Sequence, residues 1–320
     1  MSKKLLAIGH ATLDTFYKIE SPDMVCDILH EKCQVCFGFG DKVPVEDVRY
    51  SIGGGAANVA VGVTALGIET YLYSIVGDDL KGKDVLDQLK THGVNSKYVF
   101  VDDLPTDQAF ILSYTNERTI FTHNSNRKYD LTKVVFDDIG DVFLSSVGNK
   151  VSHLYDQVIQ LVKDNVGLRL FYNPGSRELL NAYEDIQRIV PYIDYLIANV
   201  EEGCTILNQG LTRNNIEIED LTNLLREKGI KTVILTDAEN GVYVNSGAGF
   251  FHTDSVKTEV QEMTGAGDAF ASGFISAILY GKDLHEATLW GVNNSSSVIK
   301  IVGAQNGLLN YDEITKIVNA

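Results

Sequence analysis

The chain has 320 residues and carries 43 acidic against 27 basic side chains, which gives a formal net charge of −16 at pH 7. Hydrophobic residues make up 44% of the sequence, a normal share for a folded protein, so wholesale disorder is excluded. A surface this acidic repels phosphate backbones and anionic lipids, so we expect neither a nucleic-acid partner nor a membrane partner.

The start of the chain and its cysteines bear on the compartment. Residues 1–10 place two lysines before an apolar run that is too short for a signal peptide, and we expect a first buried strand there. No apolar run reaches the roughly 20 residues needed to span a bilayer. The four cysteines do not indicate a disulfide scaffold. We therefore expect a cytoplasmic protein.

Strand-like and helix-like segments alternate along most of the chain and are often closed by glycine. This alternation predicts parallel βαβ units in a layered α/β domain with a mostly parallel central sheet. In chain order we predict a helix over 56–66, a strand over 70–76, a helix over 82–92, strands over 168–172 and 195–198, a helix over 218–228, a strand over 232–235 and a helix that ends at 279.

Two segments break this pattern. Residues 14–50 contain short alternating runs and no long helix, and residues 109–122 alternate in the manner of a β-hairpin. We predict that the two segments form a small β-sheet, a lid on the edge of the α/β core. The expected division is 1–12, 52–107 and 126–320 for the core, and 13–51 and 108–125 for the lid.

The strongest functional signal is the Gly-rich turn Thr264–Asp268, which precedes a predicted helix. Small residues leave the backbone N–H groups of Gly265, Ala266 and Gly267 unobstructed, so this helix start can bind an anion. Asp268 adds a carboxylate, whose pKa we expect the helix start to lower. Phosphoryl transfer needs N–H dipoles for the developing charge and a base for the attacking hydroxyl. A tight helix start capped by aspartate is the structural alternative.

A second Gly-rich segment, Gly53–Asn58, opens the helix predicted over 56–66. It lacks the Gly-Lys-Ser/Thr ending of a Walker A loop, and it lacks the preceding strand and the ribose-binding acid of a Rossmann dehydrogenase. Gly54 and Gly55 let a ligand approach the backbone closely, and Asn58 offers both a donor and an acceptor.

Through four motifs in family order, the chain resembles the ribokinase-like (PfkB-type) carbohydrate kinases. The motifs are Gly53–Asn58 with Val76–Gly82 downstream, the Asn-x-x-Glu motif at Asn199–Glu202, the C-terminal signature Thr264–Asp268, and Gly303–Gln305. The resemblance covers nearly the whole chain. It implies a ribokinase-like layered α/β domain with a lid, and transfer of a phosphoryl group from ATP, with Mg²⁺, to a primary hydroxyl of a sugar.

The resemblance also assigns roles at the acceptor side. Asp268 is expected to be the catalytic base, and the amides of Gly265–Gly267 are expected to form the anion hole. Asp14 is expected to bind sugar hydroxyls, in a pocket completed by Gly54, Gly55 and Asn58.

On the nucleotide side, the resemblance implies that Asn199 and Glu202 organise Mg²⁺ and the ATP phosphates, with Glu202 acting on the metal through water. Thr236 and Gly241 match the family's nucleotide loop, and Thr264 is expected to contact the cofactor as well.

Two positions depart from the family's pattern. Glu262 and Met263 stand where the family usually has Asp-Thr, and members often use that Asp in a monovalent-cation site, so a potassium requirement stays open. Ala238 replaces a glycine of the nucleotide loop. Because alanine disfavours a positive φ, we expect the loop backbone to differ slightly there.

A group of metal-ligating side chains lies in the predicted lid: Cys26, His30, Cys33 and Cys36. The group could hold zinc. However, Cys33 and Cys36 lie in a strand-like run, where residues three apart point to opposite faces, and no second cysteine pair exists. The pattern therefore disfavours a metal site.

A basic cluster lies in or just after the predicted hairpin: Arg118, His123, Arg127 and Lys128. It could hold a phosphate already present on the substrate. Charged loop residues are usually solvated, so we favour a solvated loop or contacts with hydroxyls.

Five aromatic side chains fall in the predicted lid: Phe16, Phe37, Phe39, Phe110 and Phe121. They could stack on a nucleobase, as in a nucleoside kinase. They could equally form the core of the lid or a lid–lid interface in a homodimer.

Together these features predict an ATP-dependent kinase of a small-molecule sugar. A nucleoside kinase is the alternative within the fold, and a non-catalytic sugar- or nucleotide-binding protein is the alternative from another class. Asp268 and the anion hole argue against a binding protein, since binding needs no base. The motifs leave open which acceptor is used and whether it already carries a phosphate, because lid residues decide this.

Overall fold

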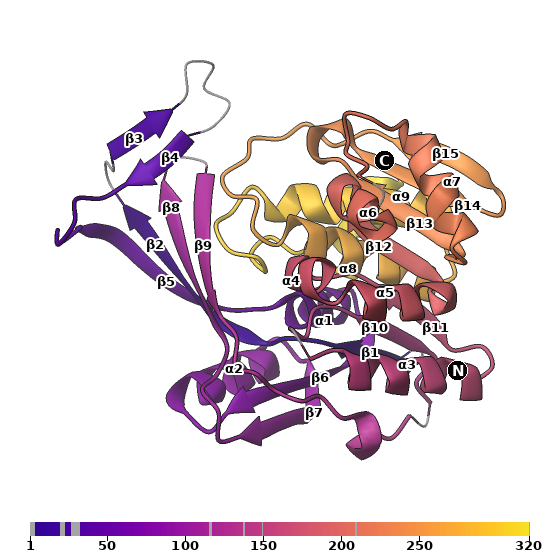
Figure 1. Cartoon of the computed structure of the whole chain (residues 1–320), viewed down its shortest axis with the longest axis horizontal. Helices are drawn as coiled ribbons and strands as arrows, with labels where there is room; N and C mark the ends of the chain where they lie inside the picture. The colour runs from indigo at the N-terminus through magenta and orange to yellow at the C-terminus, as the bar shows by residue number, and fades with distance from the viewer. Residues whose placement is uncertain are drawn as a thin grey trace.

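The computed structural model describes residues 4–19, 23–26, 33–114, 117–136, 138–148, 150–208 and 210–319 of the chain. Its main body is a nine-stranded sheet with helices on both faces, and a separate four-stranded sheet projects away from it (Figure 1). This architecture confirms the predicted layered α/β domain with a small β-sheet beside it.

The large sheet has the strand order β15-β14-β13-β12-β11-β10-β1-β6-β7. Only β14 runs antiparallel to its neighbours, so the sheet is mostly parallel, as predicted. The strands are β1 Lys4–Ile8, β6 Glu69–Gly77, β7 Asn95–Asp102, β10 Asp141–Leu144, β11 Arg169–Tyr172, β12 Tyr195–Asn199, β13 Thr232–Thr236, β14 Val242–Ser246 and β15 Gly249–Thr253.

Alternation along β1 divides the core into two halves. Leu6 and Ile8 pack in a cluster with α3 Ser152–Asp164, α4 Ser176–Asn181, α5 Tyr183–Ile189, α6 Val200–Leu207 and α7 Ile218–Glu227. Leu5 and Ala7 pack on the other face with α1 Gly55–Ala65, α2 Leu80–Thr91, α8 Ala266–Leu279, α9 Leu284–Val298 and α10 Tyr311–Val318. Within the described ranges, none of these helices has the length and apolar character needed to cross a membrane.

The elements predicted by range are all present. The helix predicted over 56–66 is α1, that over 82–92 is α2, and that over 218–228 is α7, with ends that differ by two residues at most. The strands agree as closely, and α8 ends at Leu279 as expected. Periodicity and closing glycines thus locate the elements well, because both act locally along the chain.

The smaller sheet, called the lid sheet below, has the order β5-β2-β8-β9. Its strands are β2 Thr12–Ile19, β5 Val45–Gly53, β8 Gln108–Tyr114 and β9 Glu117–His123, and β8 and β9 form the predicted hairpin. A further hairpin, β3 Asp23–Cys26 with β4 Cys33–Cys36, lies at the end of the lid sheet farthest from the main body (Figure 1).

The two faces of the lid sheet divide the predicted aromatic cluster. Phe16 is 5% exposed and packs with Ile111 of β8 and Val302 of the main body. Phe110 and Phe121 are 39% and 56% exposed. In the strand register each is one residue away from the residues that share a face with Phe16, so both point to the opposite face of the sheet. Only Phe16 therefore shares a face with Asp14, since alternate residues of a strand point the same way.

The group of Cys and His side chains that the sequence pattern disfavours as a zinc site is only partly described. Cys26 and Cys33 are backbone partners across β3 and β4, and His30 lies outside the described residues. In the described parts of the chain, no group of three or more His, Cys, Asp or Glu side chains is placed to hold a metal ion.

A buried arginine holds the connections between the two sheets. Arg127 follows β9 and is 4% exposed. Its guanidinium donates to both carboxylate oxygens of Asp102 at 2.9 and 3.0 Å and to Asp107 Oδ1 at 2.6 Å. The carbonyl oxygens of Leu104 and Pro105 accept two more bonds. The prediction of a solvated Arg127 is therefore wrong, because the preceding connection supplies acidic partners.

Asp107 extends this network to the other connections. Its Oδ2 lies 2.7 Å from Nδ1 of His10, and its Oδ1 accepts a 2.7 Å bond from the Ser125 N–H. Its carbonyl oxygen accepts from the N–H of Leu13, at the start of β2. One buried network thus fixes the positions at which β2 and β8 leave the main body and at which the chain returns after β9.

We expect Arg127→Met to lower the free energy of unfolding by about 3–5 kcal/mol, because Asp107 would keep a buried charge without its partner. Urea unfolding followed by circular dichroism measures this. Lys128→Met at the exposed neighbouring position is the matched control, with an expected change within about 0.5 kcal/mol. If the two substitutions lowered the free energy of unfolding equally, the network would not contribute to the stability of the fold.

Candidate active site

The starts of α1 and α8 meet beside the lid strand β2. Nδ2 of Asn58 donates a 2.8 Å hydrogen bond to Oδ2 of Asp268. Nε2 of Gln305 donates to Oδ1 of Asn58 at 2.9 Å and to the carbonyl oxygen of Ile52 at 3.1 Å. The sequence placed Gln305 in a motif without a role, and the structure brings it behind Asn58. Three distant segments therefore converge on one carboxylate.

Missing side chains make this approach possible. A Cβ on Gly53 would lie 2.0 Å from Oδ2 of Asp14, and one on Gly55 would lie 3.3 Å from Oδ1 of Asp268. Gly54 has a φ of 90°, which favours glycine. The segment thus places Asp14 and Asp268 around a common space, as the sequence predicted for a Gly-rich pocket.

Asp14 lies on β2 and is only 7% exposed. Burial raises its pKa to about 6, and the negative charges of Asp268 and Glu262 act in the same direction. The hydroxyl of Thr12 donates a 2.6 Å bond to Oδ1, which opposes that shift. A buried carboxylate with one oxygen engaged in this way can still accept bonds from ligand hydroxyls at the other.

Asp268 occupies the first turn of α8 and is partly buried. Burial raises its pKa to about 6, while the hydrogen bond from Asn58 opposes the shift. The expectation of a lowered pKa is wrong, because desolvation outweighs the favourable field of the helix start. The carboxyl group still ionises near neutral pH, so it can serve as a base.

The turn before α8 has one face packed and one face open. Gly265 has a φ of 79°, and a Cβ there would lie 2.5 Å from Cβ of Ala304. At Gly267 an added Cβ would meet no atom within 4 Å. The Ala266 N–H donates to the carbonyl oxygen of Met263 at 3.3 Å, whereas the Gly267 side of the turn has room for an anion beside Asp268.

Glu262 anchors this turn to the loop that follows α9. Its Oε1 accepts a 2.5 Å bond from the hydroxyl of Thr264, and its Oε2 accepts a 2.9 Å bond from the N–H of Gly303. Glu262 is 6% exposed. Thr264, predicted to contact the nucleotide, is thus tied by its hydroxyl to Glu262.

The residues predicted for the nucleotide side lie where β12 and β13 end. Asn199 and Glu202 form a capping box: Oδ1 of Asn199 accepts from the Glu202 N–H at 2.8 Å, and Oε2 of Glu202 accepts from the Asn199 N–H at 3.0 Å. Asn199 is also the register partner of Thr236. Burial raises the pKa of Glu202 to about 6, and the charge of Asp268 adds to the shift. The carboxyl ends of neighbouring parallel strands are the usual ligand edge of such sheets.

The loop after β13 keeps a left-handed residue despite its alanine. Ala238 has a φ of 46°. The turn is closed by the Gly241 N–H, which donates to the carbonyl oxygen of Ala238, and by the Asp237 N–H, which donates to that of Gly241. Gly241 has a φ of 91°, and a Cβ there would lie 2.2 Å from the carbonyl oxygen of Thr253. Alanine at position 238 therefore adopts a positive φ, and these bonds hold the turn in that conformation. A difference from the family's loop stays a prediction.

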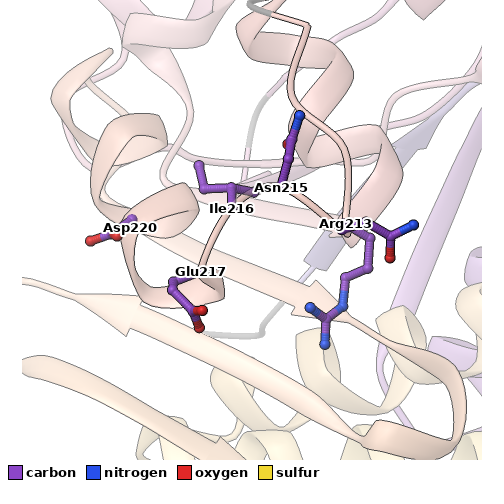
Figure 2. Close-up of a pocket in the computed structure, with 6 residues that line it drawn as sticks. Arg213, Asn215, Ile216, Glu217 and Asp220 are labelled. Carbon is purple, nitrogen blue, oxygen red and sulfur yellow. The ribbon is translucent and has the colours of Figure 1, made fainter.

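A polar depression of about 630 Å³ lies outside this loop, on the segment before α7. Figure 2 shows Arg213 on one side of it and Glu217 and Asp220 on the other. Nε of Arg213 donates a 3.1 Å bond to Oδ2 of Asp237. None of the predicted site residues lines this depression, so it is a neighbour of the site rather than its centre.

Comparison with known proteins places the chain in a kinase family. Residues 20–310 match the pattern of the pfkB family carbohydrate kinases. An ATP-dependent 6-phosphofructokinase of Thermoanaerobacterium thermosaccharolyticum is 25% identical over 287 residues, or 86% of this chain and 87% of that protein. A nucleoside kinase of Methanocaldococcus jannaschii is 25% identical over 321 residues, or 98% and 96% of the two chains. A suggested ribokinase II from E. coli, solved in complex with ATP and Mg²⁺, has the same fold, with a TM-score of 0.78 at 21% identity over 100% of this chain and 99% of that one.

We expect Ala238→Gly to raise the free energy of unfolding by up to about 1 kcal/mol. Glycine removes the steric strain of about 1–2 kcal/mol of a left-handed residue, less its own larger entropy in the unfolded chain. Ala238 is exposed, so no packing is lost. Ala248→Gly, at an exposed turn residue without a positive φ, is the control and should lower stability. A loss of stability at both positions would contradict the strain at Ala238.

Proposed function

The chain belongs to the pfkB family of carbohydrate kinases, and from that premise we propose that it transfers the γ-phosphoryl group of ATP to a primary hydroxyl of a sugar. The observation that carries this proposal is the meeting of Asp268 with the N–H groups at the start of α8, beside the buried Asp14. The reaction needs a base, a site for the transferring anionic group, and a side chain that accepts hydrogen bonds from the sugar hydroxyls.

The acceptor side would work as follows. Asp14 binds hydroxyls of the sugar and holds one primary hydroxyl toward Asp268. Asp268 takes the proton of that hydroxyl as the hydroxyl oxygen attacks the γ-phosphorus of ATP, and ADP leaves with the bridging oxygen. Asn58, itself held by Gln305, fixes the orientation of the Asp268 carboxylate. The N–H groups of Gly265–Gly267 stabilise the charge on the transferring group.

The nucleotide side fits a magnesium nucleotide. Glu202 is a partly buried carboxylate at the start of α6, and the field of Asp268 reaches it, so a divalent cation between them would relieve repulsion that now raises its pKa. Glu202 would hold the ion through water, and Asn199, Thr236 and Gly241 would line the nucleotide. Mg²⁺, when bound, supplies positive charge to the phosphates.

We also propose that residues 13–51 and 108–125 act as a lid over this site. The lid sheet carries Asp14 on its inner face and joins the main body through the buried connections around Asp107 and Arg127. Closure on the acceptor would exclude water, which competes with the sugar hydroxyl as an acceptor of the phosphoryl group.

The nucleoside kinase alternative has less support. Of the five predicted lid aromatics, only Phe16 shares the inner face with Asp14, and it packs against Ile111 and Val302. A nucleobase would need a flat aromatic surface free on this face. A sugar therefore suits the inner face better than a nucleoside does.

The outer face of the lid sheet supports a homodimer. Tyr50, Phe110 and Phe121 share this face and are 66%, 39% and 56% exposed. Apolar rings gathered on one face favour burial against another surface, and we propose a second copy of the chain. A chain that sediments as a monomer at micromolar concentration would contradict this. The lack of nucleic-acid and membrane partners stays a prediction from the acidic composition, and a cytoplasmic location stays a prediction from the short first apolar run and the four cysteines.

We expect Asp268→Asn to lower kcat by about 10²–10⁴-fold, because asparagine cannot accept the hydroxyl proton. Its side-chain oxygen can still accept the bond from Asn58, so the free energy of unfolding should change by no more than about 1 kcal/mol. Substrate-dependent ADP release over a panel of pentoses, hexoses, phosphosugars and nucleosides measures the rate, and calorimetry measures ATP affinity, which should survive. A mutant that keeps most of the wild-type rate would place the base elsewhere. A wild type that binds ATP and sugar without turnover would favour a binding protein.

The raised pKa of Asp268, about 6, predicts an acid limb in the pH profile. Below that pH the base is protonated, so kcat/KM should fall about tenfold per pH unit. The free energy of unfolding should change with pH in the direction opposite to kcat/KM. Between the unfolded value of 3.8 and about 6, the folded state binds the extra proton, so the free energy of unfolding falls as pH rises through this window. Asp268→Asn should flatten that slope, and an unchanged slope would contradict the shift.

A further inference from the structure

A cavity of about 330 Å³ lies between the lid sheet and the turn before α8. Phe16 lies on its lid side, and Val260–Glu262 and Val302 lie on its main-body side. Phe16 also packs against Val302, so the lid and the main body contact each other next to the cavity. The cavity therefore lies on the inner face of the lid sheet, the face that carries Asp14.

Strand register gathers the polar lining of this cavity into one row. Lys18 of β2 pairs with Asp47 of β5 and with Ser113 of β8, and Ser113 pairs with Arg118 of β9. All four residues line the cavity. Register partners share a face, and Lys18 is four residues from Asp14 along β2, so the row is on the Asp14 face. At about 3.3 Å per residue the row lies about 13 Å from Asp14 along the strand.

Two donors of this row lack partners. Nε of Arg118 and Oγ of Ser113 are buried, and neither has a hydrogen-bond partner in the part of the chain that the structure describes. Arg49, which also lines the cavity, donates to Asp47 at 2.7 Å. Arg118 forms no ion pair with any described acidic residue. A buried donor without an acceptor is costly, so this pair of donors is suited to an acceptor supplied by a ligand.

The acidic groups of the cavity are already engaged. Asp47 is bonded to Arg49, and both oxygens of Glu262 accept bonds from Thr264 and Gly303. Lys18 forms an ion pair with Glu46 at 2.6 Å. Among the described cationic side chains of the cavity, the one without an ion-pair partner is therefore Arg118, in a chain whose net charge is −16. A planar guanidinium matches the geometry of carboxylates and phosphates.

We propose that this cavity binds a negatively charged group, a phosphate or a carboxylate, that the acceptor carries at the end remote from its reacting hydroxyl. The proposal rests on the proposed kinase function and narrows its substrate class to phosphorylated or acidic sugars. Arg118 and Ser113 donate to the anion, Phe16 packs along the middle of the acceptor, and Asp14 binds the hydroxyls at the reacting end. Because the Arg118 side chain is long, its guanidinium can lie closer to Asp14 than the distance along the strand between the two backbone positions.

Two matched pairs of acceptors test the proposal and separate its two anions. Fructose 6-phosphate is compared with fructose, and gluconate is compared with sorbitol. For wild type we expect kcat/KM to favour the anionic member of at least one pair by about tenfold or more, because charge-assisted bonds are the stronger kind. In Arg118→Gln this ratio should fall by about 10–100-fold. Lys128→Gln, which removes an exposed cation outside the cavity, should leave the ratio as in wild type.

Calorimetry with the same four compounds, without ATP, keeps the test independent of turnover. Binding of an anionic compound that Arg118→Gln weakens and Lys128→Gln does not would support the cavity even if no acceptor were phosphorylated, in which case only the kinase proposal would fail. Turnover of neutral acceptors with no preference for their anionic partners would overturn the cavity proposal and leave the kinase intact. A preference that survives in Arg118→Gln, or no binding of either anionic compound, would also overturn it.

Discussion

The hydrogen bond from Asn58 to Asp268 forms only where the first turns of α1 and α8 lie close together. Two glycines of α1 permit this approach: Gly55 faces Asp268, and about two turns further on a Cβ at Gly62 would lie 2.3 Å from Oγ of Ser272. Helix packing and the placement of the carboxylate thus depend on the same missing side chains. A larger residue at Gly62 would push α1 away from α8 and move Asn58 away from Asp268, whereas one at Gly55 would first meet Oγ of Ser145, at 2.6 Å.

Negative charge is the second constraint on this site. Asp14, Glu202 and Asp268 all have pKa values raised to about 6, in a chain that is already strongly acidic. A phosphate ligand can enter such a site only if local donors outweigh the carboxylates. The helix start at Gly267 supplies donors at one end, and the buried Nε of Arg118, which has no partner among the described residues, supplies one at the other. The groups proposed to bind anions are therefore confined to two places, the start of α8 and the side chain of Arg118.

The sequence predicted the helices and strands, because periodicity and closing glycines are local in the chain. The structure brings Asp14, Asn58 and Asp268 together as the motifs indicated, and their roles stay predictions. The sequence failed where distant segments act. The Asp268 pKa follows burial by other elements, whereas the sequence displays only the helix start. Arg127 is buried because Asp102 and Asp107 lie beside it after folding.

The lid strand β2 combines these constraints. Asp14, Phe16 and Lys18 point to the inner face, and the residues between them point outward, where Tyr17 stacks on Phe110. A register shift of one residue would exchange the two faces, turning aromatic rings toward the active site and Asp14 away from it. The network of Asp107 and Arg127 fixes the first residues of β2 and β8, where that register begins. Because it sets which side chains face the acceptor, this buried network bears on substrate specificity as well as on stability, although none of its members lines the cavity.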